Sequence, residues 1–85
     1  MPMGVELTTR AVKDLDALKR ARPQVFQRVV NKIATLQESP EVGKRLVGPL
    51  KGMWSLRVGD YRIIYEVGKT VVVVLTVNHR KEVYR

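Results

Sequence analysis

The chain has 85 residues, with 16 Lys or Arg against 8 Asp or Glu, so its formal net charge is +8. This length allows one small domain, and we expect a single domain over residues 1–85. The absence of cysteine and the single histidine exclude disulfides, thiolate zinc sites, cysteine nucleophiles and multi-histidine metal sites. We expect no metal and no other cofactor.

The longest apolar run, at 71–75, is far shorter than the roughly 20 residues that cross a bilayer. The first four residues do not begin a signal peptide, because no basic segment precedes an apolar one. We therefore expect a cytoplasmic protein without a membrane partner.

Positive charge is concentrated in the second half of the chain. Residues 1–42 contain 7 basic and 5 acidic side chains, whereas residues 43–85 contain 9 basic and 3 acidic ones. Such an asymmetry suggests one positive face, which would attract a nucleic acid or an acidic protein, or simply keep the chain soluble.

The first half predicts one strand and two helices. Residues 5–7 alternate between apolar and polar, as a short strand does, and Thr8 or Thr9 then offers an N-cap hydroxyl. Apolar residues recur at helical spacing over roughly 9–20 and again over roughly 23–38. The short connection between these helices predicts that they pack antiparallel.

The second half predicts a three-stranded antiparallel meander. Alternating residues up to Val58 meet the turn pair Gly59-Asp60, a second alternating run covers 61–67, and a β-branched run covers 70–77 after Gly68-Lys69. The fold class is therefore α+β, with an N-terminal strand, two antiparallel helices on one sheet face, and the meander.

A two-residue loop at Gly59-Asp60 pairs Arg57 with Arg62 across the first hairpin, on the face away from the helices. Like charges placed directly opposite are unfavourable by up to about 1 kcal/mol. The pair either holds two guanidinium groups toward an anion such as phosphate or extends both into water.

A loop at Gly68-Lys69 would pair Ile64 with Val73 and Arg62 with Leu75. An apolar strip would then lie beside the arginines, on the face away from the helices. It is either a protein-binding surface or covered by the chain's own tail. Its members are Ile64, Val73, Leu75 and Val77.

The segment after this strand brings His79, Arg80 and Tyr84 close together in sequence. Arginine stabilises charge on phosphorus oxygens, and histidine or tyrosine can move the proton of an attacking hydroxyl. On RNA that hydroxyl would be the ribose 2′-OH. The alternative roles are a polar strand end for His79 and a tail anchor for Tyr84.

Three segments, 8–15, 56–65 and 77–84, resemble the RelE/ParE superfamily of small bacterial and archaeal toxins. The resemblance covers nearly the whole chain and implies the same strand–helix–helix–meander order. For the RelE branch it implies ribosome-dependent, metal-independent mRNA cleavage, in which the 2′-hydroxyl attacks the adjacent phosphate. It also implies the ribosome, mRNA and a cognate antitoxin as partners, with a toxin–antitoxin hetero-oligomer.

The same resemblance implies residue roles. Arg62 would hold the phosphate, Arg80 would stabilise transition-state charge, Tyr84 would stack on the base or move the proton, and His79 would take part in acid–base work. Relatives carry two lysines where this chain has Met53 and Ser55, so the general base is unassigned. The residues that could supply the charge and bind RNA are Lys44, Arg45, Lys51, Arg57, Lys81 and Arg85.

Three functions therefore compete. The first is an mRNA-cleaving toxin, the second is a ParE-type toxin that poisons DNA gyrase by protein binding, and the third is a basic nucleic-acid-binding module without catalysis. The match at Arg62, Arg80 and Tyr84 favours the first, and the two absent lysines keep the second open.

Overall fold

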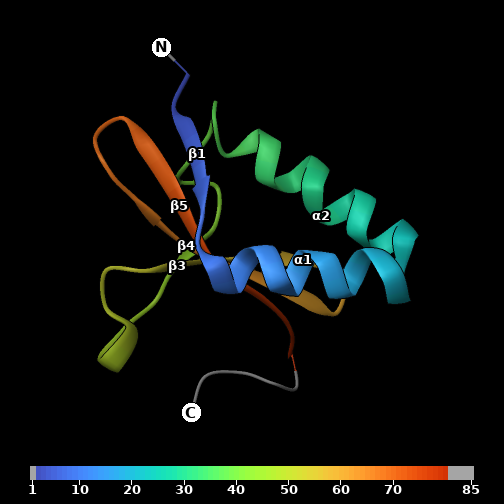
Figure 1. The fold of residues 1–85 in the computed structure, drawn as a ribbon. Coiled ribbons are helices and arrows are strands. Elements are labelled where there is room, and N and C mark those ends of the chain that lie inside the picture. Colours follow the sequence, from blue (N-terminus) through green and yellow to red (C-terminus); the bar gives the residue numbers. More distant parts are fainter. Residues whose placement is uncertain (1, 81–85) are drawn as a thin grey trace.

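The computed structural model describes residues 2–80. Two helices, a short 3-10 helix and five strands follow one another along the chain (Figure 1). In chain order they are β1 (Gly4–Leu7), α1 (Thr9–Ala21), α2 (Pro23–Thr35), β2 (Lys44–Arg45), the 3-10 helix (Gly48–Leu50), β3 (Trp54–Val58), β4 (Tyr61–Val67) and β5 (Val71–His79).

The strands form one sheet in the order β1-β5-β4-β3-β2. β1 runs parallel to β5, and the other neighbours are antiparallel. Both helices lie on one face of this sheet (Figure 1), which confirms the α+β class and the predicted element order. We call the opposite face the outer face. The two-residue strand β2 and the parallel placement of β1 were not predicted.

The helices begin where the sequence predicts. The Thr8 hydroxyl accepts a hydrogen bond from the Ala11 backbone N–H at 3.0 Å, which caps α1. Pro23 occupies the first turn of α2, where its missing N–H costs nothing. α2 ends at Thr35, three residues before the predicted end, and the chain continues in turns. Neither helix in the described part is long and apolar enough to cross a membrane.

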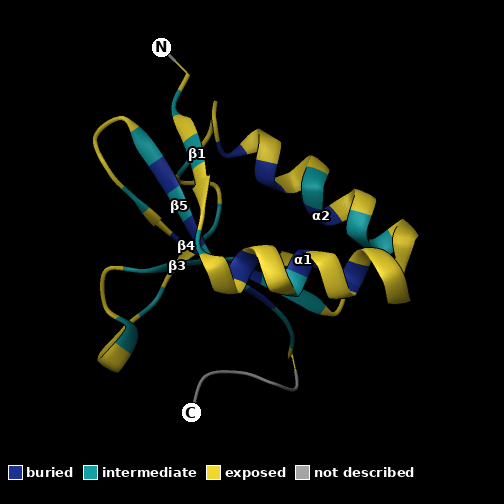
Figure 2. Cartoon of the chain, viewed as in Figure 1, coloured by how far each residue is buried: buried dark blue, intermediate teal, exposed yellow. Residues whose placement is uncertain are grey.

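Alternate residues of β4 and β5 face the helices and form the core (Figure 2). The largest fully buried side chains come from both layers, so burial of apolar area holds the helices on the sheet. They are Val29, Leu36, Ile63, Tyr65, Val72 and Val74.

The first hairpin has the predicted register, in which Arg57 lies opposite Arg62 and Val58 lies opposite Tyr61. The positive φ of 59° at Gly59 explains the glycine of this turn.

The predicted register of the second hairpin is wrong. Val67 pairs with Val72 rather than Thr70, because the loop holds four residues. A β-bulge between Ile64 and Tyr65 then shifts the pairing again, so Ile64 lies opposite Thr76.

This shift corrects the predicted apolar strip. Val77 pairs with Ile63, faces the helices and is 5% exposed, so it belongs to the core. Ile64 is also buried, at 3% exposed, and only Val73 and Leu75 remain half-buried. The four residues therefore do not form a continuous outer surface.

The carboxylate of Asp14 in α1 completes the edge of β5 beyond the end of β1. One oxygen accepts the Val77 N–H at 2.9 Å and the Thr76 hydroxyl at 2.7 Å, and the other pairs with Arg10 at 3.2 Å. A helical side chain thus takes the place of a strand neighbour and satisfies a backbone donor.

The buried Tyr65 hydroxyl ties the segment after α2 to the sheet. It donates to the Pro40 carbonyl at 2.8 Å and accepts the Gly43 N–H at 3.1 Å. Gly43 packs so closely that a Cβ there would lie 2.5 Å from the Tyr65 hydroxyl oxygen and 2.7 Å from the Ser55 carbonyl oxygen. Only glycine fits at position 43, where the backbone passes this close to Tyr65 and Ser55.

We predict that Gly43→Ala lowers the free energy of unfolding by about 1–3 kcal/mol, because the added methyl group overpacks a backbone contact. Urea denaturation measures the change. Gly4→Ala is the matched control, since a Cβ at Gly4 meets its nearest neighbours at 3.8 Å. Equal stability of the two variants would contradict this account.

The pKa of Tyr65 predicts a loss of stability at high pH. Burial raises this pKa above its ordinary value of about 10, the Gly43 hydrogen bond lowers it, and the negative charge of Glu41 raises it. Since the folded state holds the proton more tightly, the stabilisation is complete below about pH 10 and is lost as pH rises through the folded pKa.

The free energy of unfolding, measured from neutral to strongly alkaline pH, should therefore fall more steeply in the wild type than in Tyr65→Phe. The phenylalanine variant retains every other titrating group and serves as the control. If the free energy of unfolding falls equally with pH in both proteins, the alkaline loss of stability does not come from Tyr65.

Candidate nucleic-acid interface

A basic pocket lies on the outer face, across β2, β3 and β4. It encloses about 330 Å³, and none of the residues within 2–80 that line it is acidic. We call it the outer-face pocket, and its lining residues are Lys44, Leu46, Ser55, Arg57 and Arg62. Three cations around one hollow favour binding of an anionic group.

Lys44 brings a positive charge next to Ser55, which occupies one of the two positions where the resemblance to the toxin superfamily implies a lysine. It pairs with Ser55 across β2 and β3, and both residues line the outer-face pocket. Cross-strand neighbours have Cβ atoms about 5 Å apart. The ammonium group of Lys44 is therefore available next to the Ser55 position.

Arg57 and Arg62 lie opposite one another, as predicted, on the pocket side of β3 and β4. The Arg57 Nε donates to the Gly59 carbonyl at 3.0 Å, which fixes its guanidinium beside the hairpin turn. A guanidinium group can bind a phosphate through two parallel hydrogen bonds, so two of them on neighbouring strands favour an anion beside them.

Arg80 follows the end of β5 and lies beside the same hairpin. Its backbone N–H donates to the Asp60 carbonyl at 2.7 Å, and its Nε lies 3.8 Å from the Asp60 carboxylate. Asn78, two residues earlier, pairs with Arg62. The structure therefore brings Arg80 to the strand that carries Arg62.

His79 lies on the other side of the sheet from Arg62. It pairs with Tyr61, and the two rings meet edge to face with centroids 5.2 Å apart. Both rings line a pocket against α1, together with Ala17 and Ala21. Sequence reasoning grouped His79 with Arg62, but strand alternation separates them.

Of the other predicted RNA-binding residues that the structure describes, Arg45 and Lys51 lie away from the outer-face pocket. Arg45 lies over the Trp54 ring, 5.3 Å from its centroid, and lines a separate hollow with Lys51. Lys81, Tyr84 and Arg85 lie outside the described residues.

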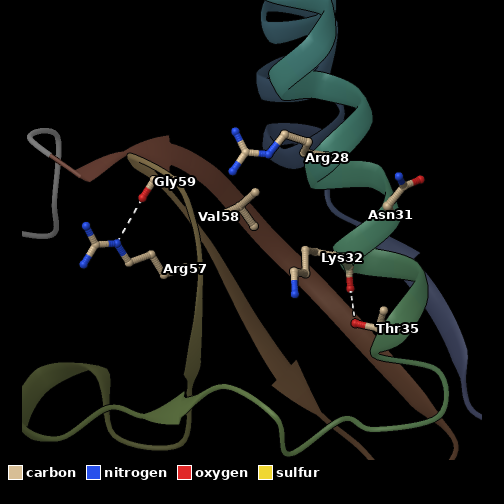
Figure 3. Close-up of a pocket in the computed structure, with 7 residues that line it drawn as sticks. All are labelled: Arg28, Asn31, Lys32, Thr35, Arg57, Val58 and Gly59. Carbon is tan, nitrogen blue, oxygen red and sulfur yellow. Dashed lines mark hydrogen bonds between the residues drawn. The ribbon is translucent and has the colours of Figure 1, made fainter.

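Sequence reasoning missed a second basic pocket, between α2 and the β3–β4 hairpin (Figure 3). We call it the α2–hairpin pocket, and it is lined by Arg28, Asn31, Lys32, Thr35, Arg57, Val58 and Gly59. The sequence does contain a signal for this pocket. Its four α2 residues recur at spacings of three and four, which places them along one stripe of the helix. Among residues 2–80, no three His, Asp or Glu side chains are grouped as metal ligands.

Comparison with known proteins identifies relatives along the whole chain. The sequence model of the family described as the ParE toxin of the type II toxin–antitoxin system parDE matches residues 5–84. Toxin RelG of Mycobacterium tuberculosis is 39% identical over 89 aligned positions, which cover 100% of this chain and 99% of RelG.

Solved structures show the same fold. A chain of the RelBE2 toxin–antitoxin complex from M. tuberculosis aligns with a TM-score of 0.82 at 37% identity, covering 94% of this chain and 100% of that one. The intact RelBE toxin–antitoxin complex of E. coli aligns with a TM-score of 0.74 at 20% identity, covering 98% and 99%.

We predict that inorganic phosphate raises the melting temperature more than chloride does at equal ionic strength, because an anion bound to the folded state stabilises it. Lys44→Gln should reduce this rise by about half, since one of the three cations of the outer-face pocket is lost. Lys69→Gln, which removes the same charge from the exposed β4–β5 loop, is the control. If Lys44→Gln and Lys69→Gln change the phosphate-induced rise in melting temperature equally, phosphate does not bind in the outer-face pocket.

Proposed function

Because the chain belongs to the ParE toxin family of type II toxin–antitoxin systems, we propose that it is a ribosome-dependent, metal-independent mRNA endonuclease of the RelE branch. The 39% identity to toxin RelG over nearly the full length of both chains supports the RelE branch. The observation that carries this proposal is the outer-face pocket, in which Lys44, Arg57 and Arg62 line one hollow.

In the proposed reaction the ribose 2′-oxygen attacks the adjacent phosphorus. The bond from this oxygen to phosphorus forms, the bond from phosphorus to the 5′-oxygen breaks, and a cyclic phosphate remains. The 2′-hydroxyl loses its proton to a base, and the leaving 5′-oxygen gains one. Negative charge grows on the phosphoryl oxygens in the transition state, so fixed cations lower the barrier.

The proposal gives each residue a distinct part. Arg62 holds the phosphate, and Arg80, at the end of the neighbouring strand, stabilises the developing charge. Lys44 lies beside Ser55 and supplies the positive charge of the lysine that is absent at position 55. Tyr84 keeps the role that the resemblance implies, in base stacking or proton transfer. His79 is proposed to take part in the acid–base chemistry from the opposite side of the sheet, where its ring contacts Tyr61.

A cognate antitoxin is the proposed inhibitor. The M. tuberculosis RelBE2 and E. coli RelBE structures are toxin–antitoxin complexes, which supports an equivalent complex for this chain. The half-buried Val73 and Leu75 remain candidates for that contact, and the buried Ile64 and Val77 do not.

The second candidate function is gyrase poisoning by protein binding. The family description names ParE, and Met53 and Ser55 occupy positions where cleaving relatives carry lysine. Cleavage of mRNA on programmed ribosomes, mapped as new 5′ ends in the A-site codon, distinguishes the two functions. No A-site cut at any protein concentration, together with accumulation of cleaved DNA in a gyrase assay, would reject the endonuclease.

In the same ribosome assay, Arg62→Ala and Arg80→Ala should each lower the cleavage rate by about 10²–10³-fold, because each removes transition-state charge stabilisation. His79→Ala should lower it by less than about tenfold, since His79 and Arg62 face opposite sides of the sheet. Circular dichroism and antitoxin binding check that each variant folds. A larger loss for His79→Ala than for Arg62→Ala would contradict these roles.

A further inference from the structure

The α2–hairpin pocket is a second basic hollow with no role in the reaction described above. It encloses about 400 Å³ between one stripe of α2 and the β3–β4 turn. Figure 3 shows Arg28 and Lys32 reaching from α2 toward the hairpin, and Arg57 leaving the hairpin on its other side. A Cβ at Gly59 would come within 3.4 Å of an Arg28 guanidinium nitrogen, so that group lies against the turn.

In the part of the chain that the structure describes, no acidic side chain pairs with the cations of this pocket. None of its seven lining residues is acidic. Within residues 2–80 the ion pairs are Arg10–Asp14 and Arg80–Asp60, and neither includes Arg28, Lys32 or Arg57. Arg28 and Lys32 lie one turn apart on α2, so their charges repel one another and a bound anion would relieve that repulsion.

The two basic pockets share one lining residue, Arg57, at one edge of the sheet. β2 pairs only with Trp54 and Ser55, so the part of β3 that carries Arg57 has no strand on the side away from β4 in the described sheet. Nothing from β2 therefore separates the pockets there. The cations follow this edge in the order Lys44 and Arg62, then Arg57, then Arg28 and Lys32.

We propose that the α2–hairpin pocket binds a backbone phosphate of the RNA, so that one RNA strand passes from the outer-face pocket around the free edge of β3 onto α2. The choice of RNA as the polyanion rests on the proposed function. The residues that line the pocket favour RNA over an acidic protein segment as the ligand. Its one large apolar residue, Val58, is only 4% exposed, whereas protein interfaces have an apolar centre and nucleic-acid interfaces are polar and positive.

The test uses the full chain and a short 2′-O-methylated RNA, which lacks the attacking hydroxyl and stays uncut. Its affinity is measured by fluorescence anisotropy over a series of salt concentrations. The double variant Arg28→Gln/Lys32→Gln should bind about tenfold more weakly. The slope of log affinity against log salt should shrink by about 0.7 for each lost phosphate contact.

The matched control is Lys13→Gln/Lys69→Gln, which removes the same charge from exposed positions outside both pockets. Equal weakening by both double variants would overturn the proposal, because only total charge would then matter. Unchanged RNA affinity with a weaker antitoxin complex would also overturn it and identify a protein ligand.

The result is independent of the ribosome assay. If no mRNA cleavage occurs but RNA affinity depends on Arg28 and Lys32 and not on the control pair, the pocket is supported and the proposed endonuclease fails. If cleavage occurs and the two double variants bind RNA equally well, the endonuclease stands and the pocket is rejected.

Discussion

The hydroxyl of Tyr65 determines where the segment after α2 meets the sheet. It is buried in the core strand β4, and it bonds to both the Pro40 carbonyl and the Gly43 N–H. Because Gly43 directly precedes Lys44, these two hydrogen bonds set the register of β2 on β3 and place the Lys44 side chain beside Ser55. The placement of one of the three cations of the outer-face pocket thus depends on a buried phenol.

The two faces of β4 and β5 carry different chemistry. Arg62 faces the outer-face pocket, whereas its neighbour Tyr61 faces α1 and contacts His79. Strand alternation makes this separation unavoidable for consecutive residues. A segment dense in functional groups, such as 78–80, therefore divides them between the two faces, because Asn78 pairs with Arg62 and His79 pairs with Tyr61.

The predictable parts of the fold are those that local sequence determines. The Thr8 cap, the Pro23 helix start and the register opposite Gly59-Asp60 follow from residues close together in the chain. The β4–β5 register was not predictable, because the bulge beside Ile64 is set by packing and by the Asp14 carboxylate from a distant helix. Lys44 reaches the site because its neighbour Gly43 donates a tertiary hydrogen bond to Tyr65, and the stripe of Arg28 and Lys32 forms a pocket only against the hairpin.

The parallel pairing of β1 with β5 also has a consequence for synthesis. Asp14 bonds to a backbone N–H that lies 63 residues further along the chain, so the sheet closes only after β5 has been made. β3 and β4 form a hairpin from neighbouring residues, and such local pairing is faster than long-range closure. On the proposed function, a growing chain carries its phosphate-binding arginines before it carries Arg80, and the ribosome that makes the toxin meets an incomplete nuclease.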